Sequence, residues 1–331
     1  MATIQDVARH AKVGVGTVSR VLSGKGYVKQ ETREKVLKSI ETLNYTPNEM
    51  ARNLFFRKSG IVAVIVPELS HPLFTQFVNA AEVALGDKGY QTMVCNTYYE
   101  NINELRYLEM LKRQRVDGII FGAHTTLDAS QYIDIQRPIV ALDRNIGKDI
   151  PYVASDHKTG GRLAAEALIK SGCKKVLQFG GIRDKDRVST PSNDRHDMFT
   201  KVMEENGIEC IPYDIKWEFT SVEYYQKVAE EFLDKYPDAD GVFATDMVIM
   251  AILQAALARG KKVPEDLKLV CYDGSAMTKL AYPRITTIQQ PVTELAEETV
   301  ELIVDLIDGK PIKNREVQLP VTLIQGDTTT I

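Results

Sequence analysis

The chain has 331 residues, which is too long for one small core and predicts two or three domains. Hydrophobic residues make up 44% and charged residues 26%, as in globular proteins, and no apolar run approaches the roughly 18 residues of a membrane span. The net charge of −4 divides unevenly, with +6 on residues 1–58 and −10 on the remainder. This asymmetry predicts a polyanionic partner for the small basic part, and the hydropathy excludes a membrane protein.

The first residues, MATIQDVARH, lack a basic region followed by an apolar core. We therefore expect no signal peptide and a cytoplasmic location. The four cysteines, Cys95, Cys173, Cys210 and Cys271, are far apart and form no CxxC pair. Their spacing favours free, buried thiols over a disulfide or a metal site, and we expect neither a metal nor a cofactor.

Residues 3–22 read TIQDVARHAKVGVGTVSRVL and predict two short helices joined by a tight turn at residues 12–14. Apolar residues recur at helical spacing on the inner side of both helices: Ile4, Val7, Ala8, Ala11, Val15, Val18, Val21 and Leu22. Small Ala8 and the turn residue Gly14 let the helices cross closely, as a helix-turn-helix requires. The polar face between them suits a DNA major groove, although periodicity alone fits an ordinary amphipathic helix pair equally well.

Two further segments complete the N-terminal part. Residues 31–43 form a third predicted helix with apolar side chains on one face, and its start lacks the usual Ser or Asp cap. Residues 48–57, NEMARNLFFR, have little to bury, and a helix of this length is marginal in water. We expect this segment to be a linker that becomes helical only on DNA.

From residue 60 onward, continuously apolar stretches alternate with helical patterns. The predicted strands cover residues 61–66, 91–95, 118–121, 139–142, 176–179, 241–244 and 267–272. The predicted helices between them cover residues 73–88, 103–114, 160–171, 223–235 and 247–259. This alternation predicts two doubly wound α/β subdomains, each with a parallel sheet covered by helices on both faces.

The pattern D-V-A-x-x-A-x-V-x-x-x-T-V-S-R-V-L, which begins at Asp6, resembles the DNA-binding motif of the LacI/GalR family of bacterial transcriptional regulators. The similarity continues through TREKV, LNY and PN at residues 32–48 and over nearly all of the remaining chain. It implies an all-α helix-turn-helix module with a hinge helix, followed by an α/β core like that of periplasmic sugar-binding proteins.

The resemblance also implies where the domains end. A helix-turn-helix domain would take residues 1–46, a hinge helix 47–59, and an effector-binding and dimerisation core 60–331. Within the core, the N-subdomain would take about 60–155 plus 290–319, and the C-subdomain about 156–289 plus 320–331. The chain would then cross between the subdomains near Ser155, Gln290 and Pro320.

In this family, the start of the second helix faces base edges, and here that helix carries Val15, Gly16, Thr17 and Arg20. An arginine such as Arg20 can give two hydrogen bonds to guanine, worth ~1–3 kcal/mol of discrimination. Val15 can only contact a thymine methyl, and Gly16 reads nothing directly. We expect phosphate contacts from Thr3, Ser19, Ser23, Tyr27 and Thr32. Thr17 and Ser19 could instead be capping or packing hydroxyls.

Leu54 matches the family leucine that wedges into the minor groove, and Asn48 is assigned to DNA contact at the start of the same hinge. Only paired hinge helices present two wedges, so we expect a homodimer on a palindromic operator in double-stranded DNA. No apolar heptads follow the last strand, which predicts a dimer and not a tetramer. Without the resemblance, the residues around Leu54 would be interpreted as a packing cluster.

Ligands of open α/β sheets bind beyond the carboxyl ends of the strands. Asp143, Asp246 and Asp273 each follow a predicted strand, where a carboxylate can accept hydrogen bonds from sugar hydroxyls. Arg195 resembles the family arginine that binds the small-molecule effector. Asp246 is as well explained as a cap of the next helix.

Position alone adds further candidates for the effector site: His71, Phe74, His124, Phe219 or Trp217 as a stacking platform, and Gln290. Each histidine also has an ordinary structural explanation. The motifs YLEML, VDGII, LDRN, YDG and TTIQQP are most similar to the sucrose-operon repressor branch of the family. They indicate a sugar effector, namely sucrose, a sucrose phosphate or a related fructoside. Because the hinge at residues 48–57 is marginal as a helix, we expect this sugar to release the repressor from DNA.

The sequence disfavours two rival functions and leaves a third open. An enzyme is disfavoured because the chain has no GxGxxG after its first strand, no GxxxxGK[ST], no GxSxG and no HExxH. A secreted sugar-binding protein is disfavoured by the missing signal peptide and the basic N-terminal module. A regulator whose DNA binding is enhanced by a corepressor or a protein partner remains open.

Overall fold

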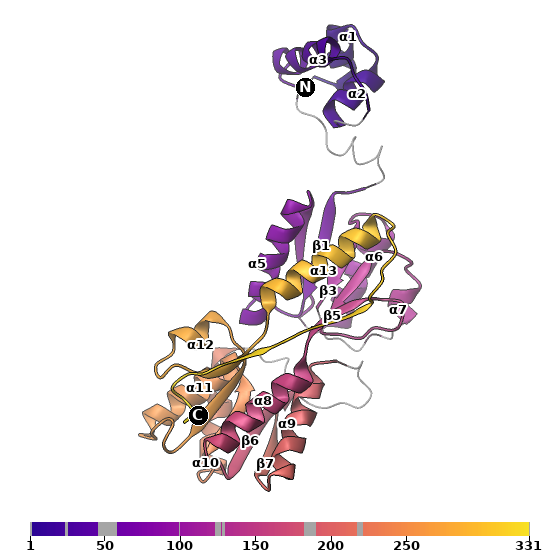
Figure 1. Ribbon diagram of the computed structural model, residues 1–331. Coiled ribbons are helices and arrows are strands. Elements are labelled where there is room, and N and C mark those ends of the chain that lie inside the picture. The colour runs from indigo at the N-terminus through magenta and orange to yellow at the C-terminus, as the bar shows by residue number, and fades with distance from the viewer. Residues whose placement is uncertain are drawn as a thin grey trace. The chain divides into compact units, whose positions relative to one another are not determined.

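The computed structural model describes residues 2–23, 26–45, 58–98, 100–122, 127, 130–181, 190–216 and 221–330 (Figure 1). By their contacts the residues divide into two compact units, Met1–Ser59 and Gly60–Ile331. None of the helices in the described ranges is long and apolar enough to cross a membrane.

The described part of the first unit holds three helices: α1 (Ile4–Ala11), α2 (Val15–Ser23) and α3 (Gln30–Thr42). Helix α1 begins with a capping box, in which Thr3 and Asp6 bind each other's backbone and side chain. It ends at Lys12, whose left-handed backbone (φ 54°) starts the turn into α2. Helix α3 starts without a side-chain cap, as expected. The helices share a small core: Val7, Ala8, Ala11, Val18, Val21 and Val36.

The second unit contains two lobes, each built on one sheet. The N-lobe sheet has the order β11-β5-β4-β3-β1-β2, and its paired strands are all parallel. Its strands are β1 (Ile61–Val66), β2 (Gln91–Asn96), β3 (Gly118–Phe121), β4 (Ile139–Leu142), β5 (Tyr152–Ser155) and β11 (Glu316–Leu319). Helices α5 (Pro72–Asp87) and α13 (Val292–Ile307) cover one face, while α6 (Asn101–Lys112) and α7 (Ser130–Ile133) cover the other.

The C-lobe sheet has the order β12-β10-β9-β8-β6-β7, with one antiparallel pair between β10 and β12. Its strands are β6 (Lys175–Gly181), β7 (Glu209–Ile215), β8 (Gly241–Thr245), β9 (Lys268–Asp273), β10 (Thr286–Gln289) and β12 (Thr322–Ile324). Helices α8 (His157–Lys170) and α9 (Asn193–Glu205) cover one face. Helices α10 (Val222–Lys235) and α11 (Asp246–Ala258) cover the other, and short α12 (Ala276–Leu280) follows β9.

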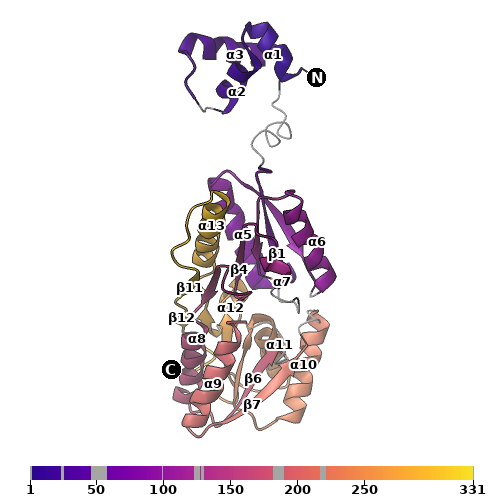
Figure 2. The ribbon, with the colours of Figure 1, turned by 90° about the vertical axis from the view of Figure 1, so that its right-hand side faces the viewer.

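The chain passes between the lobes at three places. Strand β5 ends the N-lobe run at Ser155 and α8 begins in the C-lobe at His157. Strand β10 is followed by α13, and β11 by β12, so the second and third passages lie at residues 290–291 and 320–321. Figure 2 shows the N-lobe, with β1 and β4 labelled, above the C-lobe, with β6 and β7 labelled.

The structure confirms the expected fold class of two doubly wound, mainly parallel sheets. The strand and helix ranges expected from the sequence agree with it to within a few residues. The cysteines are free; three are buried, whereas Cys210 is only partly buried. Burial raises the pKa of the Cys95 thiol to about 11, which keeps that thiol protonated and unreactive near neutral pH.

Candidate functional site

The polar face of α2 is the candidate DNA-reading surface. Val18 and Val21 are buried against α1 and α3, which turns the opposite side of α2 outward. Val15, which the periodicity placed on the inner side of its helix, is instead 43% exposed, and Gly16 and Arg20 are exposed as well. A Cβ at Gly16 would meet no described atom within 4 Å, so internal packing does not require glycine there. The exposed start of α2 can therefore approach a partner closely through its backbone.

The other expected DNA contacts have different surroundings. The Thr3 hydroxyl (2.7 Å) and the Thr3 backbone N–H (2.9 Å) both donate to Asp6 Oδ2, and these bonds lower the pKa of Asp6. Thr17, Ser19 and Thr32 are half-buried, while Tyr27 is exposed. The Ser23 side chain, Asn48 and Leu54 lie outside the described residues.

Two carboxylates from opposite lobes mark the carboxyl ends of the sheets. Asp143 directly follows β4 of the N-lobe, and Asp273 ends β9 of the C-lobe. Both are buried, and both have a positive φ, 50° for Asp143 and 96° for Asp273. Non-glycine residues rarely adopt this region, and such strain gathers at functional sites. The two backbones thus aim carboxylates into the region between the lobes.

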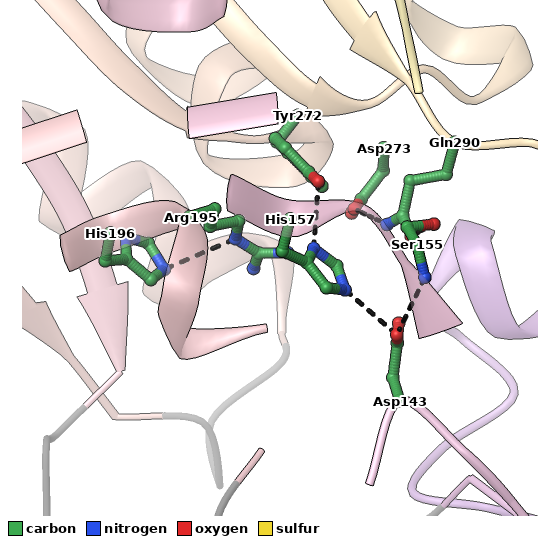
Figure 3. Close-up of polar contacts among 8 residues, drawn as sticks. All are labelled: Asp143, Ser155, His157, Arg195, His196, Tyr272, Asp273 and Gln290. Carbon is green, nitrogen blue, oxygen red and sulfur yellow. Dashed lines mark hydrogen bonds and ion pairs between the residues drawn. The ribbon is translucent and has the colours of Figure 1, made fainter. Parts of the chain in front are cut away.

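A chain of hydrogen bonds surrounds Asp143 (Figure 3). Asp143 Oδ1 accepts from the Ser155 backbone N–H (3.3 Å) and lies 2.9 Å from His157 Nε2. The other ring nitrogen, His157 Nδ1, lies 2.8 Å from the Tyr272 hydroxyl. Ser155 ends the N-lobe run and His157 begins the C-lobe, so the N-lobe carboxylate is bound to both sides of the first passage.

Asp273 is held from the second passage. Gln290 Nε2 donates to Asp273 Oδ1 (2.7 Å), and Gln290 Oε1 accepts from the Ser155 hydroxyl (2.7 Å). Both polar ends of the buried Gln290 amide are therefore engaged within the protein. The residue predicted as an effector ligand links the first two passages in this structure.

Arg195, near the start of α9, is 7% exposed and lies beside Tyr272. Its guanidinium carbon is 4.4 Å from the centroid of the Tyr272 ring, within cation–π range, and its Nε lies 3.4 Å from His196 Nε2. The guanidinium thus lies on the ring of Tyr272, the residue that precedes Asp273 in β9.

His71 and Phe74 come from the start of α5 in the N-lobe. Both are buried, with ring centroids 5.3 Å apart. Burial lowers the pKa of His71; Asp273 raises it, and Arg195 lowers it further. The N-lobe histidine therefore lies within electrostatic range of the Asp273 and Arg195 side chains of the C-lobe.

Asp246 is surrounded by protein groups. Its Oδ1 accepts from the Cys271 thiol (2.8 Å) and its Oδ2 from the Ser275 backbone N–H (2.9 Å), and it is buried at the start of α11. Burial, and then the nearby Asp273 charge, raise its pKa to about 6. This arrangement favours the structural explanation of Asp246 over the ligand one.

His124, Trp217 and Phe219 lie outside the described residues. Sequence reasoning missed Ser155, His157 and Tyr272, which join the candidate residues to one another. Tyr272 directly precedes Asp273 at the end of an apolar run, and this position could have marked it as a site residue. His157 gave no such signal, because its partners are distant in sequence and β5 was not among the predicted strands.

Comparisons with known proteins agree with this architecture. Residues 3–48 match the family "Bacterial regulatory proteins, lacI family", and residues 165–329 match "Periplasmic binding protein-like domain". The ribose operon repressor of Halalkalibacterium halodurans is 37% identical over 330 residues, which cover 99% of this chain and 97% of that protein. The sucrose operon repressor of Lactococcus lactis subsp. lactis is 37% identical over 326 residues, 98% and 99% of the two chains. The chain belongs to the lacI family.

Solved structures of transcriptional regulators resemble the whole chain. The lac repressor dimer bound to operator and the anti-inducer ONPF is 26% identical, with a TM-score of 0.84 and coverage of 100% of this chain and 99% of that one. The transcriptional regulator CelR in complex with cellobiose is 30% identical, with a TM-score of 0.71 and coverage of 99% and 100%. The resemblance noted in the sequence is thus confirmed over the full length.

Proposed function

We propose that this lacI-family protein represses a sugar-utilisation operon and leaves its operator when a sugar binds between the two lobes. The observation that carries the proposal is a set of contacts that links Asp143 of the N-lobe to two C-lobe residues. His157 and Tyr272 join it to Arg195, and Ser155 and Gln290 join it to Asp273. A ligand held by both lobes fixes their relative orientation, which is what an allosteric effector must do.

The chemistry of these side chains suits a neutral polyol. Carboxylates such as Asp143 and Asp273 accept hydrogen bonds from paired hydroxyl groups, and Arg195 donates to hydroxyl or ring oxygens. His71 and Phe74 add ring faces from the opposite lobe, against which the apolar face of a sugar packs. We assign the effector site to these five residues.

The motifs noted in the sequence favour sucrose or a related fructoside as the effector. The ribose operon repressor and the sucrose operon repressor named above are both 37% identical to this chain. A test of the effector therefore compares sucrose, fructose, sucrose phosphate and ribose side by side.

DNA binding is assigned to residues 1–46, with 47–59 as the hinge helix and 60–331 as the core. The exposed start of α2 supports this assignment, with Arg20 reading a base and Val15 packing on a thymine methyl. Unit 1 has its own core, which supports a separate DNA-binding domain.

We propose that an exposed apolar face on α5 and around the end of α12 is the interface with a second copy of the chain. Val83 on α5 is 65% exposed, and Leu280 and Tyr282, at and after the end of α12, are 87% and 90% exposed. Gln76 of α5 and Lys279 of α12 line one groove of about 590 Å³, so both elements face the same side. Large exposed apolar side chains on one face are typical of a protein interface, and a dimer supplies two helix-turn-helix units for a palindrome.

Calorimetric titration of the purified protein with the four sugars tests the effector site. Asp143→Ala should abolish binding of the sugar that the natural protein binds, whereas the exposed Asp149→Ala of the same lobe should leave it unchanged. Binding that survives Asp143→Ala would refute the assigned site, and binding of no sugar would favour the corepressor or protein-partner alternative.

A further inference from the structure

His157 joins the two lobes through a single buried imidazole. It is the first residue of α8, directly after the first passage, and it is 2% exposed. Its Nε2 lies 2.9 Å from Asp143 Oδ1 at the end of β4, and its Nδ1 lies 2.8 Å from the hydroxyl of Tyr272 in β9. One ring therefore touches the N-lobe carboxylate on one side and a C-lobe strand on the other (Figure 3).

The hydrogen-bond partners fix the tautomer of the neutral ring. An ionised carboxylate only accepts hydrogen bonds, so His157 Nε2 carries the proton that is donated to Asp143. His157 Nδ1 is then an acceptor, and the Tyr272 hydroxyl donates to it. Both hydrogen bonds therefore run the same way: Tyr272 donates to His157, and His157 donates to the Asp143 carboxylate.

Tyr272 extends this chain to the C-lobe arginine. The Arg195 guanidinium lies over the same ring whose hydroxyl binds His157, 4.4 Å from its centroid. The His157 and Tyr272 rings also stack, with centroids 5.6 Å apart and an interplanar angle of 27°. Arg195, Tyr272, His157 and Asp143 thus form one continuous set of contacts across the lobes.

Two glycines of α8 make room for this arrangement. A Cβ at Gly160 would lie 2.6 Å from the Tyr272 hydroxyl oxygen, and a Cβ at Gly161 would collide with the carbonyl oxygen of Arg195. Glycine within a helix is unfavourable by about 1 kcal/mol relative to alanine. The sequence HKTGG therefore combines the bridging histidine with the space that Tyr272 and Arg195 need.

We propose that His157 is a positioning residue of the effector site, which through Tyr272 holds Asp143 and Arg195 in one fixed relation across the lobes. The proposal rests on the proposed function, since it assumes that these two side chains bind the effector. His157 touches no effector itself in this account; it sets the geometry in which both lobes grip one ligand.

Calorimetric sugar binding by three variants and one matched control tests the role. Tyr272→Phe keeps the ring under Arg195 and removes only the hydroxyl, so affinity should fall about fivefold, the worth of one hydrogen bond. His157→Phe should lower affinity by at least about tenfold, and His157→Gln, which keeps one donor and one acceptor, should restore part of it. Tyr132→Phe is the control, because the buried Tyr132 hydroxyl has no hydrogen-bond partner among the described residues, and it should change nothing.

Thermal unfolding of each variant separates positioning from folding. A role in stability alone would lower the unfolding temperature of His157→Phe and leave the sugar affinity of the folded protein unchanged, which would overturn the proposal. Equal affinity of natural protein and Tyr272→Phe would overturn it as well.

Nitrogen-15 NMR of the imidazoles tests the bridge without any sugar, so its failure is distinguishable from failure of the proposed function. The natural protein should show a proton on His157 Nε2 that exchanges slowly with water. A ring that lacks the Nε2 proton, or one averaging rapidly between tautomers, would contradict the bridge even if a sugar binds.

Discussion

Arg144 and Glu104 form an ion pair in which both side chains are wholly buried, with Arg144 Nη1 3.3 Å from Glu104 Oε1. The guanidinium also lies 5.1 Å from the Phe121 ring centroid and 5.2 Å from that of Tyr132. Arg144 directly follows Asp143, so the pair anchors the segment after β4 to α6. The ion pair thus holds in place the backbone next to Asp143, whose carboxylate is assigned to the effector site.

Breaking this pair on one side should be costly. Arg144→Met leaves the Glu104 carboxylate buried without its cation and should lower the free energy of unfolding by about 3–5 kcal/mol. The double variant Arg144→Met with Glu104→Leu leaves no buried charge and should recover most of that loss. Urea unfolding of the three proteins checks this, and equal losses in single and double variants would show that the charge is not the cause.

Arg20 should carry much of the discrimination between operator and other DNA. Arg20→Ala should weaken operator binding by ~1–3 kcal/mol more than binding to a random duplex, since a bidentate contact to guanine is sequence-specific. Lys29→Ala, at the start of α3, removes only a positive charge and should weaken binding to both duplexes alike. Equal losses on both duplexes for Arg20→Ala, at one fixed salt concentration, would remove Arg20 from the reading surface.

The buried strands could be predicted from the sequence because their apolar runs are continuous. Strands β1 and β3 lie in the middle of the N-lobe sheet, where both faces are covered, so every side chain is apolar. Strands β11 and β12 lie at sheet edges, and their residues alternate between exposed and half-buried, which leaves no apolar run to recognise. Helix α13 is amphipathic and was recognisable, yet it was not among the predicted helices.

The site could be predicted only in part, for a similar reason. Asp143 and Asp273 were found because each directly follows an apolar strand. The bond between His157 and Tyr272 joins residues 115 positions apart, and that pairing depends on where the chain passes between lobes. Local pattern carries no information about such a pairing.

Asp246 should make stability depend on pH. Its pKa is raised from 3.8 to about 6 by burial and by Asp273, so the folded state holds this proton more tightly than the unfolded chain does. The stability that it contributes is therefore complete below about pH 4 and is lost as the pH rises through about 6. Asp246→Asn should be more stable than the natural protein at pH 7, by about 2–3 kcal/mol at most, and the difference should vanish near pH 4. Urea unfolding between pH 4 and 8 measures this difference in the free energy of unfolding, with Asp149→Asn as the control. A difference that does not change with pH would refute the raised pKa of Asp246.

The apolar face that carries Val83 and Tyr282 should hold the dimer together. Tyr282→Asp places a charge at the centre of the proposed contact and should convert the dimer to monomer at micromolar concentration. Val222→Asp, on α10, changes a residue that is also exposed and should leave the dimer intact. Light scattering measures the molar mass of the natural protein and of both variants. A monomeric natural protein or a dimeric Tyr282→Asp variant would exclude this face as the interface.

The central claim is that a sugar bound between the lobes weakens operator binding. A hundredfold change in operator affinity requires about 2.7 kcal/mol of differential sugar binding between the two states. The most direct measurement is operator affinity during titration with sucrose, fructose, sucrose phosphate and ribose, for the natural protein and for Asp273→Ala. We expect one of these sugars to weaken operator binding by the natural protein, and Asp273→Ala to bind operator normally without responding. If no sugar weakens binding, or if one strengthens it, release by a sugar is the wrong mechanism.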